Sequence, residues 1–208
     1  MKGKFIVIEG LEGAGKSTAM SVCKQFFADH HIPLLCTREP GGTPVAEALR
    51  EIVKGDWDEN ITDQTELLLM YAARHQLVEN QIKPALSRGT WVLGDRHDMS
   101  TQAYQGGGRE IPQSVIQSIK AVTLGDFKPD VTLYLDVEPE EGLKRARGRG
   151  DLDRIEMSGS AFFQRSRDTY LEIAANDESV IVIDAMLPID QVLSAILAAL
   201  KKVLEPAC

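Results

Sequence analysis

Residues 10–17 of the chain read Gly10-Leu11-Glu12-Gly13-Ala14-Gly15-Lys16-Ser17, directly after an apolar run at residues 5–8. This order fits the phosphate-binding pattern of a glycine, four further residues and then Gly-Lys-Ser/Thr. A buried strand is expected to end near Glu9 and a helix to begin near Gly15. The loop glycines let backbone N–H groups turn toward phosphate oxygens, and the helix N-terminus attracts them. We therefore expect Lys16 to reach the β- and γ-phosphates of a nucleoside triphosphate and Ser17 to ligate magnesium.

The composition of the chain excludes several classes of protein. With 208 residues, of which 43% are hydrophobic and 26% charged, it is typical of one globular α/β domain. No apolar stretch approaches the roughly 20 residues that span a membrane. A formal net charge of −8 argues against nonspecific binding of nucleic acid, which needs a broad basic surface.

The start of the chain and its cysteines indicate a compartment. The first predicted strand follows Met1 almost directly, so we expect no secretory signal. The cysteines, Cys23, Cys36 and Cys208, are odd in number and lack the spacing of a metal site. We expect free thiols in a reducing cytoplasm.

Short β-branched or apolar runs alternate with longer helical patterns along the chain, which is typical of a parallel sheet with crossover helices. We expect strands at residues 4–9, 34–38, 90–95, 131–136 and 179–184. We expect helices at residues 15–30, 45–53, 63–87, 112–125, 138–147, 160–176 and 189–204. No repeat or linker interrupts the pattern, so it predicts one three-layer domain over residues 1–208.

Candidate functional residues follow the predicted strands, at the edge of the sheet where ligands of such folds bind. The second strand leads into a tight turn at residues 38–42, in which the bond before Pro40 is either cis or trans. The third strand ends in Asp95, Arg96 and His97. An aspartate there often only caps a turn. With the phosphate-binding loop upstream, we favour support of magnesium by Asp95 and of phosphate by Arg96.

A basic segment extends over residues 144–154 and contains Arg145, Arg147 and Arg149 next to two glycines. It is either a solvated helix end or a mobile lid, at about residues 145–156, that closes over the triphosphate. As a lid it would bring Arg149 to the transferred phosphoryl group, where such an arginine is worth roughly 10³–10⁵ in rate.

The remaining candidates for chemistry are one helical arginine and the histidines. Arg74, in the predicted helix at 63–87, either extends to solvent or closes the far end of an acceptor pocket. The histidines, His30, His31, His75 and His97, share no spacing of metal ligands. Phosphoryl transfer to a phosphate needs no nucleophile system, because the accepting oxygen is already ionised.

With these motifs in place, the chain resembles the bacterial thymidylate kinase family over nearly its full length. The matching segments are residues 5–18, 37–42, 72–74, 94–108, 133–136 and 145–156. The resemblance implies a P-loop nucleoside monophosphate kinase fold, with a five-stranded parallel sheet flanked by helices and a short lid. It implies transfer of the γ-phosphoryl group of ATP to dTMP, with Mg²⁺, in a cytoplasmic homodimer that supplies dTTP synthesis.

The resemblance also assigns roles to residues. It places ATP on residues 10–18, from Gly10 to Thr18, and on Arg145 and Arg147, with Ser17 and Asp95 at the metal. Lys16, Asp95, Arg96 and Arg149 would carry catalysis. The residues implied for dTMP are Glu12 at the 3′-hydroxyl, Arg38 and Arg96 at the phosphate, Arg74 at the thymine carbonyl, Thr101 and Gln102 at the base edge, Tyr104 against a 2′-hydroxyl, and Ser100 without a stated contact.

One position departs from the family pattern. Met70 stands four residues before Arg74, where a phenylalanine commonly stacks on thymine. Its thioether can pack on a ring face, or Tyr71 serves instead. Two rival functions stay open: another nucleoside monophosphate kinase, for UMP for example, and a P-loop ATPase or switch. A switch would call for an Asp-x-x-Gly motif after the third strand, where residues 95–97 stand. For the dimer contact we expect the helix near residues 67–77.

Overall fold

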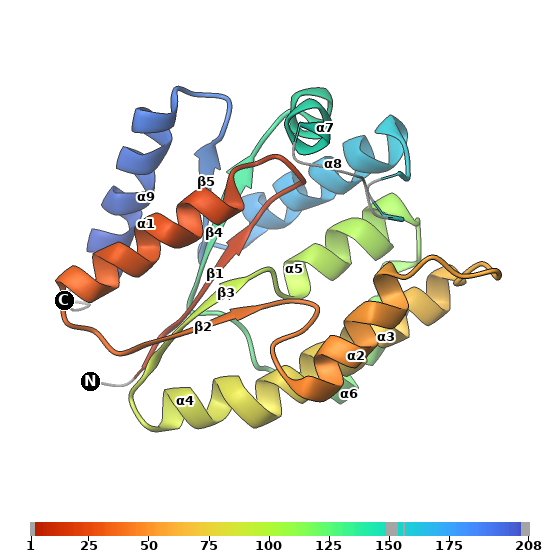
Figure 1. Ribbon diagram of the computed structural model, residues 1–208, viewed down its shortest axis with the longest axis horizontal. Coiled ribbons are helices and arrows are strands. Elements are labelled where there is room, and N and C mark those ends of the chain that lie inside the picture. The colour runs from red at the N-terminus through yellow and green to blue at the C-terminus, as the bar shows by residue number, and fades with distance from the viewer. Residues whose placement is uncertain (1–2, 149–153, 156, 205–208) are drawn as a thin grey trace.

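The chain forms a sheet of parallel strands in the order β2-β3-β1-β4-β5 (Figure 1). The computed structural model describes residues 3–148, 154–155 and 157–204. The strands are β1 (Phe5–Glu9), β2 (Leu34–Arg38), β3 (Trp91–Asp95), β4 (Val131–Asp136) and β5 (Val180–Asp184). All predicted strands are confirmed, and each ends at the predicted residue.

The predicted helices are also present. They are α1 (Lys16–Asp29), α2 (Pro44–Lys54), α3 (Asp63–Leu77), α4 (Lys83–Ser87), α6 (Gln113–Thr123), α7 (Pro139–Arg147), α8 (Ser160–Asn176) and α9 (Ile189–Leu204). The helix predicted over residues 63–87 is a continuous run of α3, a π-helical segment η1 (Val78–Ile82) and α4. Among the described helices, none combines the length and the apolar character needed to cross a membrane.

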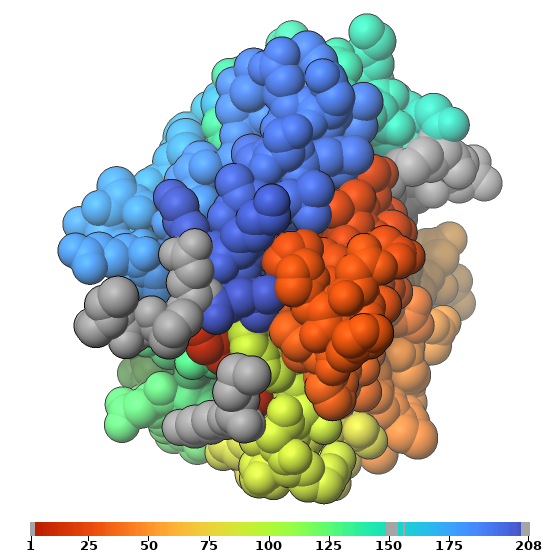
Figure 2. Space-filling model, turned by 90° about the vertical axis from the view of Figure 1, so that its left-hand side faces the viewer, coloured from red at the N-terminus to blue at the C-terminus, as the bar shows by residue number. Residues whose placement is uncertain are grey.

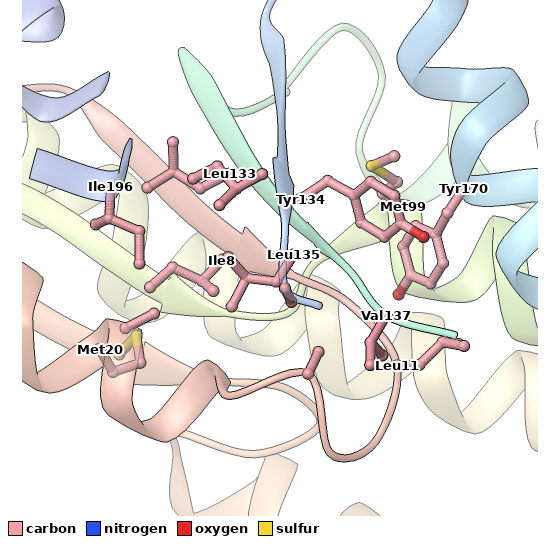
Figure 3. Packing of buried hydrophobic residues seen from close by; sticks show 14 of the residues in the cluster. Ile8, Leu11, Met20, Met99, Leu133, Tyr134, Leu135, Val137, Tyr170 and Ile196 are labelled. Atoms are coloured by element: carbon pink, nitrogen blue, oxygen red, sulfur yellow. The ribbon is translucent and has the colours of Figure 1, made fainter. Parts of the chain in front are cut away.

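The central strand β1 separates two layers of core. Ile6 and Ile8 pack in a cluster that contains α1 and α9, part of which Figure 3 shows. Phe5 and Val7 lie in a second cluster with residues of α3 and α6. Figure 2 shows α1 and α9 side by side on the surface of the first layer. Because successive strand residues face opposite sides of a sheet, this arrangement confirms the three-layer α/β architecture.

A helical segment that the sequence did not predict follows β3. It consists of α5 (Asp98–Thr101) and the π-helical η2 (Gln102–Gly108). Its glycines are turn signals in sequence, but here they permit close packing on α8. A Cβ atom on Gly107 would lie 2.2 Å from Thr169 Oγ1, and one on Gly108 would lie 2.3 Å from Phe162.

The start of this segment is held by a residue distant in sequence. Glu9, at the end of β1, accepts hydrogen bonds from the backbone N–H groups of His97 (2.7 Å) and Ser100 (3.2 Å). A carboxylate at these N–H groups acts as a helix cap, although caps usually come from the helix's own flank. Tertiary contacts of this kind explain why local pattern reading missed the helix.

The strand register brings the candidate residues to one edge of the sheet. Asp95 pairs in register with Ile8 on one side and with Arg38 on the other. The carboxyl ends of β1, β2 and β3 therefore lie next to each other, with the phosphate-binding loop and residues 38–42 beyond them. Of the two expected alternatives for the Glu39–Pro40 peptide bond, the structure has the cis form.

Candidate active site

A cavity of about 290 Å³ opens at this edge of the sheet. It gathers most of the predicted site residues, namely Glu12, Lys16, Ser17, Arg38, Met70, Arg74, Asp95, Arg96, Ser100, Thr101 and Tyr104. It also includes residues that the sequence did not single out, namely Glu39, Arg50, Lys54, Gln105 and Ile155. One hollow thus joins the phosphate-binding loop to the end of α3, which is what a donor and an acceptor that react with each other require.

The phosphate-binding loop holds its lysine inside the loop. Lys16 Nζ donates hydrogen bonds to the carbonyl oxygens of Gly10 (2.9 Å) and Leu11 (2.8 Å). Burial and the nearby positive charge of Arg96 lower the pKa of the Lys16 ammonium to about 8. An anion in the loop would supply the negative charge that favours the ammonium form.

Backbone contact between the loop and α7 requires glycine at two positions. Gly13 has a φ of +74°, and a Cβ atom there would lie 2.0 Å from the carbonyl oxygen of Gly142. A Cβ atom on Gly142 would in turn lie 2.5 Å from the carbonyl oxygen of Glu12. The helix that leads to the basic segment therefore rests directly on the phosphate-binding loop.

Arg96 and Tyr104 converge on Glu12. Arg96 Nη2 donates to Glu12 Oε1 at 2.5 Å, and the Tyr104 hydroxyl donates to Glu12 Oε2 at 2.6 Å. The Arg96 guanidinium also lies over the Tyr104 ring, 5.0 Å from its centroid. Burial raises the pKa of Glu12, but the charges of Arg96 and Lys16 outweigh it and hold that pKa below its usual range. The result is an ionised carboxylate between the loop and the cavity.

The backbone of Arg96 is itself unusual. Its φ is +70°, in the left-handed region that non-glycine residues rarely occupy. Such strain costs of order 1–3 kcal/mol and tends to occur at functional sites. Here it accompanies a guanidinium that also donates to Ser100 Oγ at 3.1 Å. The unusual backbone conformation thus coincides with a side chain that lines the cavity.

Arg74 is buried, so the interpretation in which it extends to solvent is wrong. Its Nε donates to Glu39 Oε2 at 2.6 Å, and its Nη2 donates to the His97 carbonyl (3.0 Å) and to Thr101 Oγ1 (2.9 Å). Its Nη1 is buried and has no hydrogen-bond partner within the described residues. A buried donor without a partner is costly unless something bonds to it. Arg74 therefore offers one donor at the far end of the cavity.

The two candidates for base packing are separated by their burial. Met70 is partly buried and lines the cavity. Tyr71 is 1% exposed, and its hydroxyl donates to Asp98 Oδ1 at 2.8 Å, away from the cavity lining. The alternative in which Tyr71 serves the base is therefore not supported by its position.

Gln102 was expected at the base but does not line the first cavity, whereas Gln105, for which no role was expected, does line it. Gln102 donates to Asp98 Oδ2 at 2.8 Å and lines a different groove, beside α6 and α8. In an α-helix successive residues point about 100° apart, and in helices of this kind residues four apart lie close to the same face. Thr101 and Gln105 are four apart, and both line the cavity. A helical prediction for residues 98–108 would have found this pair.

Asp95 and Ser17 fit a magnesium ion in the same cavity. Asp95 Oδ1 is buried and lacks a hydrogen-bond partner within the described residues. Those residues contain no group of three or more acidic, histidine or cysteine side chains that could hold a metal. One carboxylate and one hydroxyl suit Mg²⁺, which usually takes its other ligands from waters and substrate phosphates.

A second cavity, of about 250 Å³, adjoins the other side of the phosphate-binding loop. It is lined by the predicted residues Ala14, Gly15, Thr18 and Arg145, and by apolar residues such as Leu187 and Ile189. Arg145 Nη1 donates to the Ala185 carbonyl at 3.0 Å, which fixes one side of this cavity. Ala185 and its neighbours follow β5 and were not assigned a role from sequence.

The remaining basic residues divide into three cases. Arg38 pairs with Glu47 at 2.9 Å at the mouth of the first cavity. Arg147 is exposed and is not among the residues that line either cavity. Arg149, the predicted catalytic arginine, lies outside the described residues, as do Cys208 and most of the predicted lid at 145–156 that follows residue 148.

Several known proteins are similar to this chain over most of its length. The family model described as thymidylate kinase matches residues 8–196. A thymidylate kinase of Alteromonas mediterranea is 59% identical over 192 residues, which cover 92% of this chain and 86% of that protein. One from Idiomarina loihiensis is 57% identical over 98% of this chain and 100% of that protein, and one from Shewanella loihica is 56% identical over 96% and 95%. The chain belongs to the thymidylate kinase family.

Proposed function

We propose that this protein transfers the γ-phosphoryl group of ATP to dTMP, giving dTDP and ADP. The observation that carries the proposal is the buried Nη1 of Arg74, at the end of the cavity that begins at Lys16: among the described residues it has no hydrogen-bond partner, only an ion pair with Asp98 Oδ1 at 3.9 Å. A pyrimidine carbonyl would bond to it. The name of the relatives agrees with a thymidylate acceptor.

The phosphate-binding loop and the second cavity would hold ATP. The triphosphate would lie on the backbone of residues 10–18, and Lys16 would exchange its two carbonyl contacts for phosphate oxygens. The adenine would occupy the second cavity, between the guanidinium of Arg145 and the apolar residues after β5. Arg147 is proposed to contact the donor from α7.

The first cavity would hold dTMP. Arg96, with Arg38, would bind the phosphate, and Glu12 would accept a hydrogen bond from the sugar 3′-hydroxyl. Tyr104 lies against Glu12 and would leave no space for a 2′-hydroxyl. Of the remaining predicted residues, Ser100 and Thr101 face the cavity and Met70 would pack on the base.

Gln105 adds a contact to the base. Its Nε2 donates to Glu66 Oε1 at 2.7 Å, which leaves its Oε1 as the polar atom that it can present to the cavity. Thymine offers a carbonyl acceptor next to an N–H donor. Arg74 Nη1 and Gln105 Oε1 complement those two groups, whereas cytosine carries an amino group and an unprotonated ring nitrogen there.

The residues of the site would carry out transfer by positioning and charge. Ser17 and Asp95 would hold Mg²⁺, which when bound neutralises charge on the donor phosphates. Arg96 would orient the acceptor oxygen, which is already ionised and needs no general base. Arg149 would meet the charge of the transferred group. We expect Arg149→Ala to lower kcat by about 10³-fold with little change in the KM for dTMP, and equal changes in both would remove this role.

We further propose that the enzyme is a cytoplasmic homodimer. Neighbouring helices α3 and α6 carry exposed apolar side chains, including Leu68 (56% exposed) and Val122 (86% exposed). A second copy that covers these helices would remove them from water. The free thiols of Cys23 and Cys36 are consistent with a reducing compartment.

An ADP-release assay with a panel of monophosphates tests the proposed activity. We expect turnover to require an acceptor and to be highest with dTMP. Turnover of UMP should be at least about 100-fold lower, because its 2′-hydroxyl would meet Tyr104 and disturb the hydrogen bond from Tyr104 to Glu12. Comparable turnover of UMP and dTMP would contradict the proposed acceptor. ADP release without any acceptor would favour an ATPase.

A further inference from the structure

Glu66 is a buried carboxylate behind the base end of the first cavity. It lies on α3 and its side chain has no exposed surface. Its Oε1 accepts from Gln105 Nε2 at 2.7 Å and from Arg109 Nε at 3.3 Å. Its Oε2 accepts from Arg109 Nη2 at 3.2 Å and from Arg154 Nη2 at 2.5 Å. One side chain thus joins α3, η2 and the residue Arg154.

The charge state of Glu66 follows from these partners. Burial alone raises the pKa of a carboxyl group. The hydrogen bonds from Gln105 and the two arginines, with the positive charge of Arg109, outweigh burial and hold the pKa of Glu66 below its usual range. Glu66 is therefore a carboxylate at neutral pH, and a carboxylate accepts hydrogen bonds but donates none.

This property decides which way the amide of Gln105 points. An amide has a donating end and an accepting end, and only the donating end can face a carboxylate. Gln105 must therefore keep Nε2 toward Glu66. Its carbonyl oxygen is then left toward the cavity, near the region that Arg74 and Thr101 also line.

We propose that Glu66 is a positioning residue that selects the acceptor base by locking the amide of Gln105 with its oxygen toward the cavity. The proposal rests on the acceptor function proposed above. A base with a ring N–H next to a carbonyl, as in thymine, is matched by this oxygen and by Arg74 Nη1. A base with an unprotonated ring nitrogen, as in cytosine, would place two acceptors against each other.

Replacement of Glu66 by glutamine tests the proposal, because an amide at residue 66 can donate as well as accept. Gln105 would then be free to turn over. We expect Glu66→Gln to lower kcat/KM for dTMP about tenfold, mainly through KM, and to raise the ratio of dCMP to dTMP turnover by about tenfold or more. A purely structural role would lower both activities together and leave the ratio unchanged.

An exchanged pair provides the matched control. In the double variant Glu66→Gln with Gln105→Glu, the carboxylate is at residue 105 and can present only acceptors to the base, whichever way residue 66 turns. We expect the ratio of dCMP to dTMP turnover to return to within about threefold of the wild type. In Gln105→Met, which has no amide, a further Glu66→Gln change should leave the ratio unaltered.

The arginine contacts of Glu66 are controlled separately. Arg109→Lys disturbs the same carboxylate but leaves Gln105 in place, so the base ratio should stay at the wild-type value. Thermal unfolding identifies any variant that fails to fold. If Glu66→Gln does not fold, the exchanged pair and Gln105→Met decide the question.

The two proposals fail in different ways. A wild-type enzyme that does not phosphorylate dTMP would remove the proposed function. A wild-type enzyme that prefers dTMP, with the same preference in Glu66→Gln or with an exchanged pair that selects no better than Gln105→Met, would overturn the role of Glu66 alone.

Discussion

The donor and acceptor halves of the site are held in different ways. In the donor half, Lys16 bonds to carbonyl groups five and six residues earlier in the chain. In the acceptor half, Arg96 bonds to Glu12 across 84 residues, Arg74 to Glu39 across 35, and Gln105 to Glu66 across 39. In the proposed assignment, phosphate binding would thus rest on contacts that are local in sequence, whereas acceptor recognition would depend on long-range pairs of buried side chains.

This difference has an energetic side. The donor loop offers an anion mainly backbone N–H groups, and the one side-chain charge of the loop that is assigned to phosphate is the buried ammonium of Lys16. Each acceptor-side pair buries a carboxylate. In the Arg96–Glu12 and Arg74–Glu39 ion pairs, removal of one member would leave the other as a buried charge without its partner in the pair, which typically costs about 3–5 kcal/mol. In the acceptor half, the directions of hydrogen-bond donors and acceptors are therefore fixed before the substrate arrives, at a cost in folding stability.

The largest expected effect breaks the donor half through its backbone. In Gly13→Ala the new Cβ atom would lie 2.0 Å from the Gly142 carbonyl, so backbone must move. We expect a loss of about 3 kcal/mol or more of stability, which corresponds to roughly 6–12 °C in Tm. A displaced loop should also lower kcat/KM for ATP at least about 100-fold.

Gly15→Ala is the matched control for that clash. Gly15 also has a positive φ, +92°, but a Cβ atom there meets nothing within 4 Å. Only the strain of about 1–2 kcal/mol should remain. Equal losses of Tm in the two variants would show that close contact with α7 is not what Gly13 is needed for.

The next largest expected effect is a change at Glu12 that should weaken use of dTMP but not use of ATP. Glu12 stands in the donor loop but pairs with Arg96 and Tyr104 of the acceptor half. We expect Glu12→Gln to lower kcat/KM for dTMP about 10–100-fold and to reduce discrimination against a 3′-deoxy analogue. The KM for ATP should stay within about threefold. Steady-state kinetics that show the larger loss with ATP would contradict the division.

A pH effect of intermediate size tests the role of Lys16 in the donor half. Only the ammonium form of Lys16 attracts phosphate, and its pKa of about 8 in the free protein lies below the usual value. The ammonium therefore predominates below pH 8 and is lost as pH rises. We expect kcat/KM for ATP to fall by up to about tenfold per pH unit above pH 8. An unchanged value up to pH 10 would contradict this assignment.

Lys16→Arg supplies the control for the pH profile. A guanidinium does not titrate in this range. The variant should be less active, but the alkaline decline that belongs to residue 16 should be absent from its profile.

The smallest expected effect concerns packing on the base. Met70 contributes an adaptable apolar surface to the cavity. We expect Met70→Ala to raise the KM for dTMP about 2–10-fold, and Met70→Phe to keep it near the wild-type value, because a ring contact is worth about 0.5–1.5 kcal/mol. A change in the KM for ATP instead would place Met70 in the wrong half of the site.

The same division explains what the sequence predicted. Strand ends, the phosphate-binding loop and Asp95 follow from local order, and the structure places them as expected. The segment at residues 98–108 was not predicted, because Glu9 caps it from another strand and its glycines serve packing on α8. Gln102, which the family resemblance implied at the base, therefore lines a different groove, and Gln105, which lines the cavity, was not singled out. The buried Glu39 and Glu66 gave no local signal, since their roles arise only from tertiary pairing.

A crystal structure with dTMP and a non-hydrolysable ATP analogue would test the division of the site most directly. We expect the dTMP phosphate on Arg96, a thymine carbonyl within hydrogen-bond distance of Arg74 Nη1, and the adenine beside Arg145. A thymine ring bound beside Arg145, or an Arg74 Nη1 that stays unpaired in the complex, would contradict it.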